Sequence, residues 1–145
     1  MTTETFVVAY ECEEDSSSVL AYAIARAQKD GALLHLVHVL EWSPYTFLTP
    51  QEIEERTTRR KQEMTRAQEA IIDPALAKAR AAGVEANGEI RFGQVVEIIS
   101  ETATKLNADM IIVGRSGSNS VAARVFGSVP LGLAQIAKVP TVIVP

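Results

Sequence analysis

The stretch Met110-Ile111-Ile112-Val113-Gly114-Arg115-Ser116-Gly117, followed after nine residues by Gly127-Ser128, decides the fold. An apolar run of the buried-strand type leads into a loop with closely spaced glycines. Glycine lets backbone N–H groups approach a ligand without a Cβ in the way, and a helix N-terminus adds unpaired N–H donors and the positive end of a dipole. The stretch therefore predicts a strand, an anion-holding loop and a helix, with a phosphate group as the expected ligand.

The charge of the chain changes sign at this stretch. Residues 1–109 hold all eighteen acidic residues and eleven basic ones, a net charge of −7, whereas residues 110–145 hold only Arg115, Arg124 and Lys138. A segment free of carboxylates suits a phosphate ligand. The whole chain carries −4, and this balance argues against nucleic acid and anionic membranes as partners, because both bind clustered positive charge.

Length and composition fit one domain. The 145 residues, 47% of them hydrophobic, are enough for one globular core, and we expect a single domain over residues 1–145. No apolar run reaches the ~18 residues that a membrane span needs, and the first five residues lack the basic start of a signal peptide. The lone Cys12 forms no internal disulfide. We therefore expect a cytoplasmic protein without membrane insertion.

Strand and helix patterns alternate along the chain. The predicted strands are Phe6–Ala9, Leu33–Leu40, Val84–Phe92, Asp109–Val113 and Pro140–Pro145. Four helical segments are predicted. The first begins at Asp15 or Ser16, and the second covers Gln51–Ala82 with a kink or a new helix start at Asp73-Pro74. The third runs from Val95 to Leu106, and the fourth begins near Ser128. Gly31 and Gly83 follow the first two helical segments, as glycine commonly does at a helix end.

This alternation predicts an α/β fold with a doubly wound, five-stranded parallel sheet flanked by helices. Leu33–Leu40 is apolar on both faces, as in strands that helices cover on two sides. In such sheets, ligands bind beyond the carboxyl ends of the strands, where the strand order reverses. In the order 3-2-1-4-5, that crevice lies between strands 1 and 4, and the loop after Gly114 leaves strand 4.

The pattern G-x₂-G-x₉-G-S, formed by Gly114, Gly117, Gly127 and Ser128, resembles the nucleotide-binding branch of the universal stress protein A family at every spacing. The likeness extends to 6–11, His38-Val39, 108–114 and 139–144, and so covers nearly the whole chain. It implies an adenine nucleotide alpha hydrolase-like domain that holds ATP, or AMP or ADP. It also implies a homodimer formed through the last strand, residues 140–145.

The resemblance further implies which residues meet the nucleotide. Val39 would contact adenine through its main chain, and Ala9 and Val113 would line the base pocket. Donors to the ribose and phosphates would come from Gly114, Gly117, Gly127, Ser128 and Val129.

The end of the first strand departs from the family pattern. The family usually has Asp followed by a small residue there, whereas this chain has Glu11 followed by Cys12. A carboxylate is retained, so a ribose contact, or a Mg²⁺ that bridges from the phosphates, is compatible with it. Glu13, Glu14 and Asp15 follow, and these carboxylates would repel a triphosphate from the first helix. We therefore expect the phosphates on the Gly114 side.

Other side chains have both a functional and a structural interpretation. The aromatic residues of the loop before Pro50 suit core or dimer packing better than a cover over adenine, and Arg115 and Arg124 suit surface charge as well as a phosphate clamp. His35 and His38 point to opposite faces of one strand and cannot share a site. No catalytic triad, Walker A sequence or His-Glu-x-x-His is present, and we assign no residue to catalysis or to a metal.

We therefore predict an ATP-binding regulatory protein of the stress-response type, in which nucleotide occupancy shifts the population of a dimer or of a surface for an unidentified effector protein. One alternative is slow ATP hydrolysis at the same site, with Glu11 as base or metal contact. Another is a dimeric interaction protein without nucleotide, because Glu11-Cys12 departs from the family pattern.

Overall fold

The structure, a computed structural model, describes residues 3–11, 17–41, 49–115 and 128–145. Within them, one sheet is ordered β3-β2-β1-β4-β5, and all its neighbouring strands are parallel. Its strands are β1 (Thr5–Ala9), β2 (Leu33–Leu40), β3 (Ala86–Phe92), β4 (Met110–Gly114) and β5 (Thr141–Val144). This order confirms the predicted doubly wound fold.

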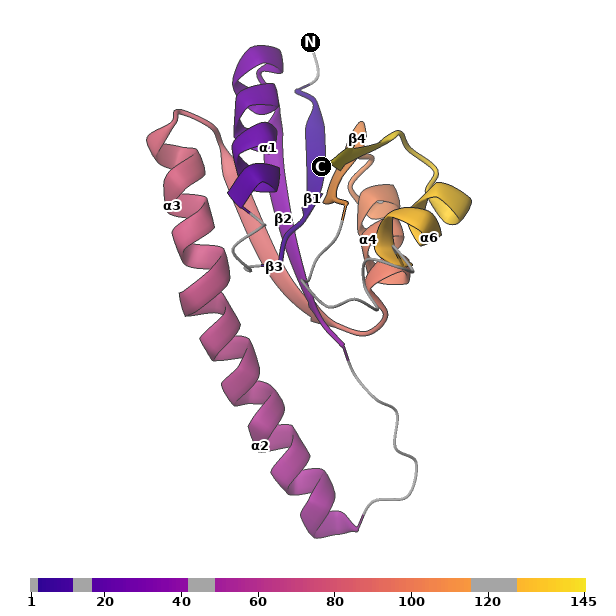
Figure 1. Ribbon diagram of the computed structural model, residues 1–145. Coiled ribbons are helices and arrows are strands. Elements are labelled where there is room, and N and C mark those ends of the chain that lie inside the picture. The colour runs from indigo at the N-terminus through magenta and orange to yellow at the C-terminus, as the bar shows by residue number, and fades with distance from the viewer. Residues whose placement is uncertain (1–2, 12–16, 42–48, 116–127) are drawn as a thin grey trace.

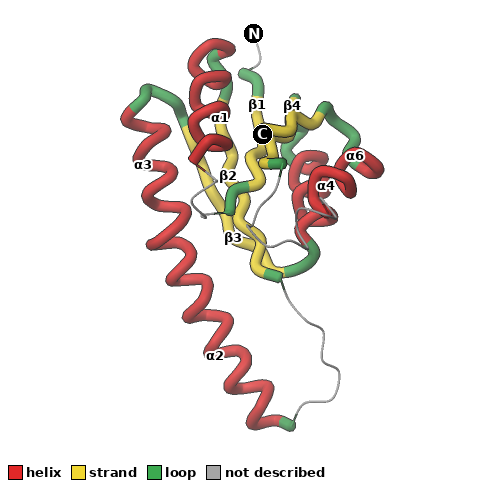
Figure 2. The backbone as a smooth tube through the Cα atoms, viewed as in Figure 1, coloured by secondary structure: helices red, strands yellow, loops and turns green. Residues whose placement is uncertain are grey.

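Helices cover both faces of the sheet (Figure 1; Figure 2). The first face, here called the α1 face, packs against α1 (Ser17–Asp30), the π-helical turn η2 (Gln68–Ile72) and α3 (Asp73–Ala81). The second, the α4 face, packs against α4 (Val95–Lys105) and α6 (Ser128–Ile136). Along β2, Leu34 and Leu36 lie in the first core cluster, and Val37 and Val39 lie in the second. Burial on both sides explains the unbroken apolar run of β2.

Helices α1, α3 and α4 end in the same way. The residue after each last turn has a positive φ: 65° at Gly31, 80° at Gly83 and 51° at Asn107. The next backbone N–H then reaches back to a carbonyl of the last turn, as Val84 does to Ala79 O at 3.0 Å. Val84 thus belongs to the end of α3, and β3 begins at Ala86, two residues later than the sequence predicts.

The predicted helix over Gln51–Ala82 consists of three pieces: α2 (Pro50–Ala67), the π-helical turn and α3, which starts at Asp73 as one reading of the sequence predicts. Ala67 is the only buried residue of α2, and the next buried residue is Ile72. This five-residue step matches the i→i+5 bonding of a π-helical turn, so the turn keeps both residues buried.

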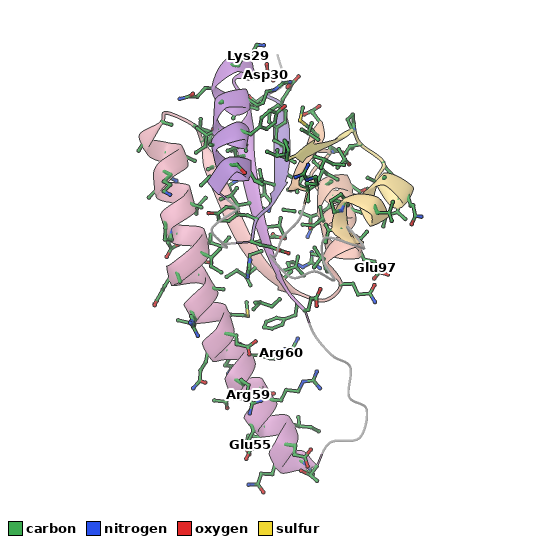
Figure 3. All side chains as sticks on the ribbon, in the orientation of Figure 1. Lys29, Asp30, Glu55, Arg59, Arg60 and Glu97 are labelled. Atoms are coloured by element: carbon green, nitrogen blue, oxygen red, sulfur yellow. The ribbon has the colours of Figure 1, made fainter. Side chains whose placement is uncertain are left out.

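Helix α2 extends beyond the ends of the strands, where Figure 3 labels Glu55, Arg59 and Arg60. The Arg60 guanidinium lies 4.5 Å from the centroid of the Phe92 ring, at the end of β3. Within the described segments, no helix is both long enough and apolar enough to cross a membrane.

Candidate functional site

The central strand β1 stops short of the two strands beside it. Its register with β2 ends at Ala9, although β2 continues to Leu40 beside β3. Its register with β4 ends at Val8, although β4 continues to Gly114 beside β5. The space beyond Ala9, between the ends of β2 and β4, is called the notch below. It lies where the strand order reverses, the position at which open α/β sheets bind ligands.

Backbone polar groups of both flanking strands face the notch. The N–H of Tyr10 donates to Val37 O at 2.9 Å, so Val37, and with it Val39 two residues later, directs its N–H and C=O toward β1. On β4, the N–H of Arg115 donates to Val144 O of β5 at 2.8 Å. Successive residues of a strand point their backbone groups to opposite sides, so the N–H and C=O of Gly114 point toward β1. Because the registers of β1 stop earlier, the notch presents backbone donors and acceptors from β2 and β4.

The three residues predicted to meet the base, Ala9, Val39 and Val113, come together on the α4 face, where Val129, a predicted donor to the ribose and phosphates, joins them. Val39 and Val113 are 8% and 4% exposed and belong to one core cluster. Ala9 of β1 and Val129 of α6 are half-buried and pack against the same cluster. Four elements therefore form an apolar wall beside the polar backbone of the notch, the combination that small-molecule sites use.

Gly114 has a packing role that does not depend on a ligand. It is the last residue of β4, whereas the sequence places it at the start of the loop. A Cβ built on it would lie 3.0 Å from Cγ2 of Val19 in α1, so glycine allows α1 to approach the end of β4 closely. This position on the α1 face leaves the backbone of Gly114 free to face the notch.

The predicted site residues Gly117 and Gly127, and other side chains that the sequence singles out, lie outside the described segments. Ser128 begins α6, and its backbone is described but its side chain is not. The following are wholly outside: Cys12, Glu13, Glu14, Asp15, Trp42, Tyr45, Phe47, Gly117, Arg124 and Gly127. The predicted phosphate loop is thus seen only at its two ends, Arg115 and Ser128.

The two histidines of β2 lie on opposite faces, as the sequence predicts. His35 Nε2 lies 3.4 Å from Glu89 Oε2 on β3. His38 is 9% exposed, and its Nδ1 lies 2.9 Å from the carbonyl oxygen of Tyr10, the residue after β1. Because a carbonyl oxygen only accepts, His38 Nδ1 carries the proton and donates. The sequence does not predict this contact, for which a polar residue near the end of an apolar strand is the only signal.

Glu11 supplies a carboxylate close to the notch. It is half-buried and lies two residues beyond β1. Within the part of the chain that the structure describes, no group of three His, Cys, Asp or Glu side chains could hold a metal ion. The described residues therefore offer one carboxylate near the notch rather than a preformed metal cage.

Comparisons with known proteins agree with this fold. A family model described as the universal stress protein family matches residues 2–145. Universal stress protein UspA from Lactobacillus plantarum is similar in structure, with a TM-score of 0.85 at 19% identity over 100% of this chain and 99% of that one. A universal stress protein in complex with cAMP gives 0.72 at 23% identity, over 100% and 98% of the two chains.

A third structure, the universal stress protein from Archaeoglobus fulgidus in complex with dAMP, has a TM-score of 0.61 at 18% identity, covering 99% of this chain and 98% of that one. At these identities the likeness concerns the fold. No curated protein matches the sequence.

Proposed function

The chain belongs to the universal stress protein family, and from this premise we propose that it is an adenine nucleotide-binding regulatory protein whose site is the notch. The observation that carries the proposal is the backbone of Val39, which directs an N–H and a C=O together toward the space where β1 has ended. Adenine presents a ring nitrogen acceptor beside an amino donor, so one residue can bind its edge with two hydrogen bonds. Ala9 and Val113 would cover the faces of the base.

In this proposal the phosphates bind on the β4 side of the notch, opposite Val39 of β2. Gly114 brings a backbone that faces the notch, and Gly117, Gly127, Ser128 and Val129 supply the remaining donors by their match to the family pattern. The segment from Met110 onward contains no carboxylate, whereas Glu11 stands at the end of β1. Glu11 would therefore meet the ribose, or a Mg²⁺ that accompanies ATP, rather than the phosphates themselves.

Two structural relatives support adenine as the base. One was solved with cAMP and the other with dAMP, and these ligands share the adenine ring and differ in sugar and phosphate. Val39 is proposed to bind this shared adenine ring. We propose ATP for this chain, with AMP or ADP as alternatives, and a regulatory role in which occupancy biases an effector surface in the cytoplasm.

Mass spectrometry of the small molecules released on denaturing the freshly purified protein tests this function. ATP near one equivalent per chain is the expected result, together with calorimetric binding of ATP and Mg²⁺ to the emptied protein. ADP or AMP in place of ATP would favour slow hydrolysis, and Glu11→Gln should then abolish turnover but keep binding. An empty protein that also ignores added nucleotide would contradict the proposal and favour a nucleotide-free interaction protein.

We also propose a homodimer through β5, the edge strand on this side of the sheet. Among the described residues, large exposed apolar side chains gather here: Ile143 of β5 is 45% exposed, and Leu131 and Ile136 of α6 are 60% and 46% exposed. An edge strand with apolar neighbours needs a cover, and a second copy supplies one by continuing the sheet.

Replacing Ile143 by Lys should therefore weaken the dimer at least tenfold, because a charge would enter an apolar interface (~1.4 kcal/mol for each factor of ten). Sedimentation velocity across micromolar concentrations measures the effect. Ile53→Lys is the matched control, since Ile53 is 51% exposed on α2, away from β5. A monomeric wild-type protein, or equal effects of both variants, would contradict an interface at β5.

A further inference from the structure

We propose that His38 is a positioning residue that keeps the N–H of Val39 available to the adenine ring. It does so by holding the Tyr10 carbonyl, which would otherwise be the partner of that N–H. This inference rests on the proposed nucleotide site, and it assigns to that site a side chain on the α1 face, on the other side of the sheet from the apolar wall.

The register of the sheet identifies the competing acceptor. In a parallel ladder, Val37 receives the N–H of Tyr10, and two residues later the N–H of Val39 would donate to the carbonyl of Tyr10. The β1–β2 register stops before this bond, and within the described segments no backbone hydrogen bond joins Val39 to Tyr10. The carbonyl that would continue the ladder is thus in register with Val39 but does not pair with it.

His38 explains why the ladder stops there. Its Nδ1–H donates to Tyr10 O over 2.9 Å in a buried setting, and its ring lies on the α1 face, where Tyr10 is itself 7% exposed. A buried carbonyl needs a donor, and once the imidazole satisfies it, the Val39 N–H is no longer required. The ring therefore fixes the end of β1 in a position that leaves the polar edge of Val39 facing the notch.

A variant series separates this role from packing. Asn at position 38 places its amide nitrogen at the same distance from the backbone as Nδ1, Gln places it one carbon farther, and Leu fills the space without a donor. We expect His38→Asn to bind ATP within threefold of the wild type. His38→Leu and His38→Gln should lose roughly tenfold, the usual cost of one buried hydrogen bond. Loss of affinity in His38→Asn equal to that in His38→Leu would overturn the proposal.

A readout on the nucleotide-free protein distinguishes failure of this inference from failure of the proposed function. Scalar coupling across a hydrogen bond, measured by a long-range HNCO experiment, should be absent between Val39 N and the Tyr10 carbonyl carbon in the wild type. It should appear in His38→Leu, where the carbonyl takes the nearest backbone donor. Coupling already present in the wild type overturns the role of His38, whatever the nucleotide measurements show.

Nucleotide analogues complete the test. The penalty of His38→Leu should fall to within twofold of wild type when ATP is replaced by 1-deaza-ATP, which lacks the ring nitrogen that would accept from Val39. A penalty that persists undiminished with the analogue shows that His38 acts by another route and overturns the inference. Wild-type protein that binds no adenine nucleotide refutes the proposed function, while the coupling measurement still decides how His38 and Tyr10 are bonded.

Discussion

Replacing Gly88 by Ala is expected to lower the free energy of unfolding by about 2 kcal/mol, within the usual range for overpacking a core. Gly88 lies in β3 beneath the π-helical turn, and a Cβ built on it would come within 2.6 Å of Ile72 Cγ2. Ile72 is fully buried in a closely packed cluster, so it cannot move aside without disturbing its neighbours. Urea unfolding followed by circular dichroism measures the loss.

Two variants show whether the contact with Ile72 is the cause. Gly83→Ala puts its Cβ in open space but at a φ of 80°, so only the cost of a left-handed backbone applies, about 1 kcal/mol. Ile72→Leu removes the Cγ2 methyl while conserving volume, and in that background Gly88→Ala should cost at least half a kcal/mol less. If Gly88→Ala lowers the free energy of unfolding equally in the wild type and in Ile72→Leu, the close approach to Ile72 is not what destabilises the variant.

The same pair of residues shows where sequence reasoning about the fold reaches its limit. The order of strands and helices could be predicted because each strand is a short apolar run and each helix has its own apolar stripe. The π-helical turn could not, because Gln68–Ile72 has no composition that distinguishes it from an α-helix. What favours the turn is tertiary packing: Ala67 and Ile72 are both buried, and Gly88 of β3 makes room for Ile72.

For the candidate site, the sequence indicates which strand ends supply apolar residues, but it does not indicate the shape of the notch. The apolar runs that end at Ala9 and Val113, together with the resemblance, point to Ala9, Val39 and Val113; the structure places Val39 and Val113 in one buried cluster with Ala9 packed against it, and their contact with a nucleotide stays a prediction. The shape of the notch depends on the residue at which each pair of strands stops pairing. For β1 and β2 we attribute this end point to the hydrogen bond from the His38 side chain to the Tyr10 backbone carbonyl. A single sequence does not encode such a bond in any periodic pattern, so the sequence and the resemblance place His38 at the end of the strand without indicating its partner.

Ala9→Phe is expected to weaken ATP binding at least 100-fold while leaving the fold intact (~2.7 kcal/mol of binding free energy). Ala9 is the last residue of β1 and half-buried, and its side chain packs on the cluster that contains Val39 and Val113. A phenyl ring at this position would project into the space proposed for the base and compete with it directly. Calorimetric titration with ATP and Mg²⁺ measures the affinity, and thermal unfolding checks that the protein remains folded.

The control for this substitution is Ala21→Phe, which adds the same ring to an exposed position of α1. Its ATP affinity should stay within twofold of the wild type, because α1 packs on the other face of the sheet from the base. If Ala9→Phe binds ATP as tightly as this control, the base does not lie against β1. The nucleotide would then have to bind without contacting Ala9, for example between Val39 of β2 and Val113 of β4.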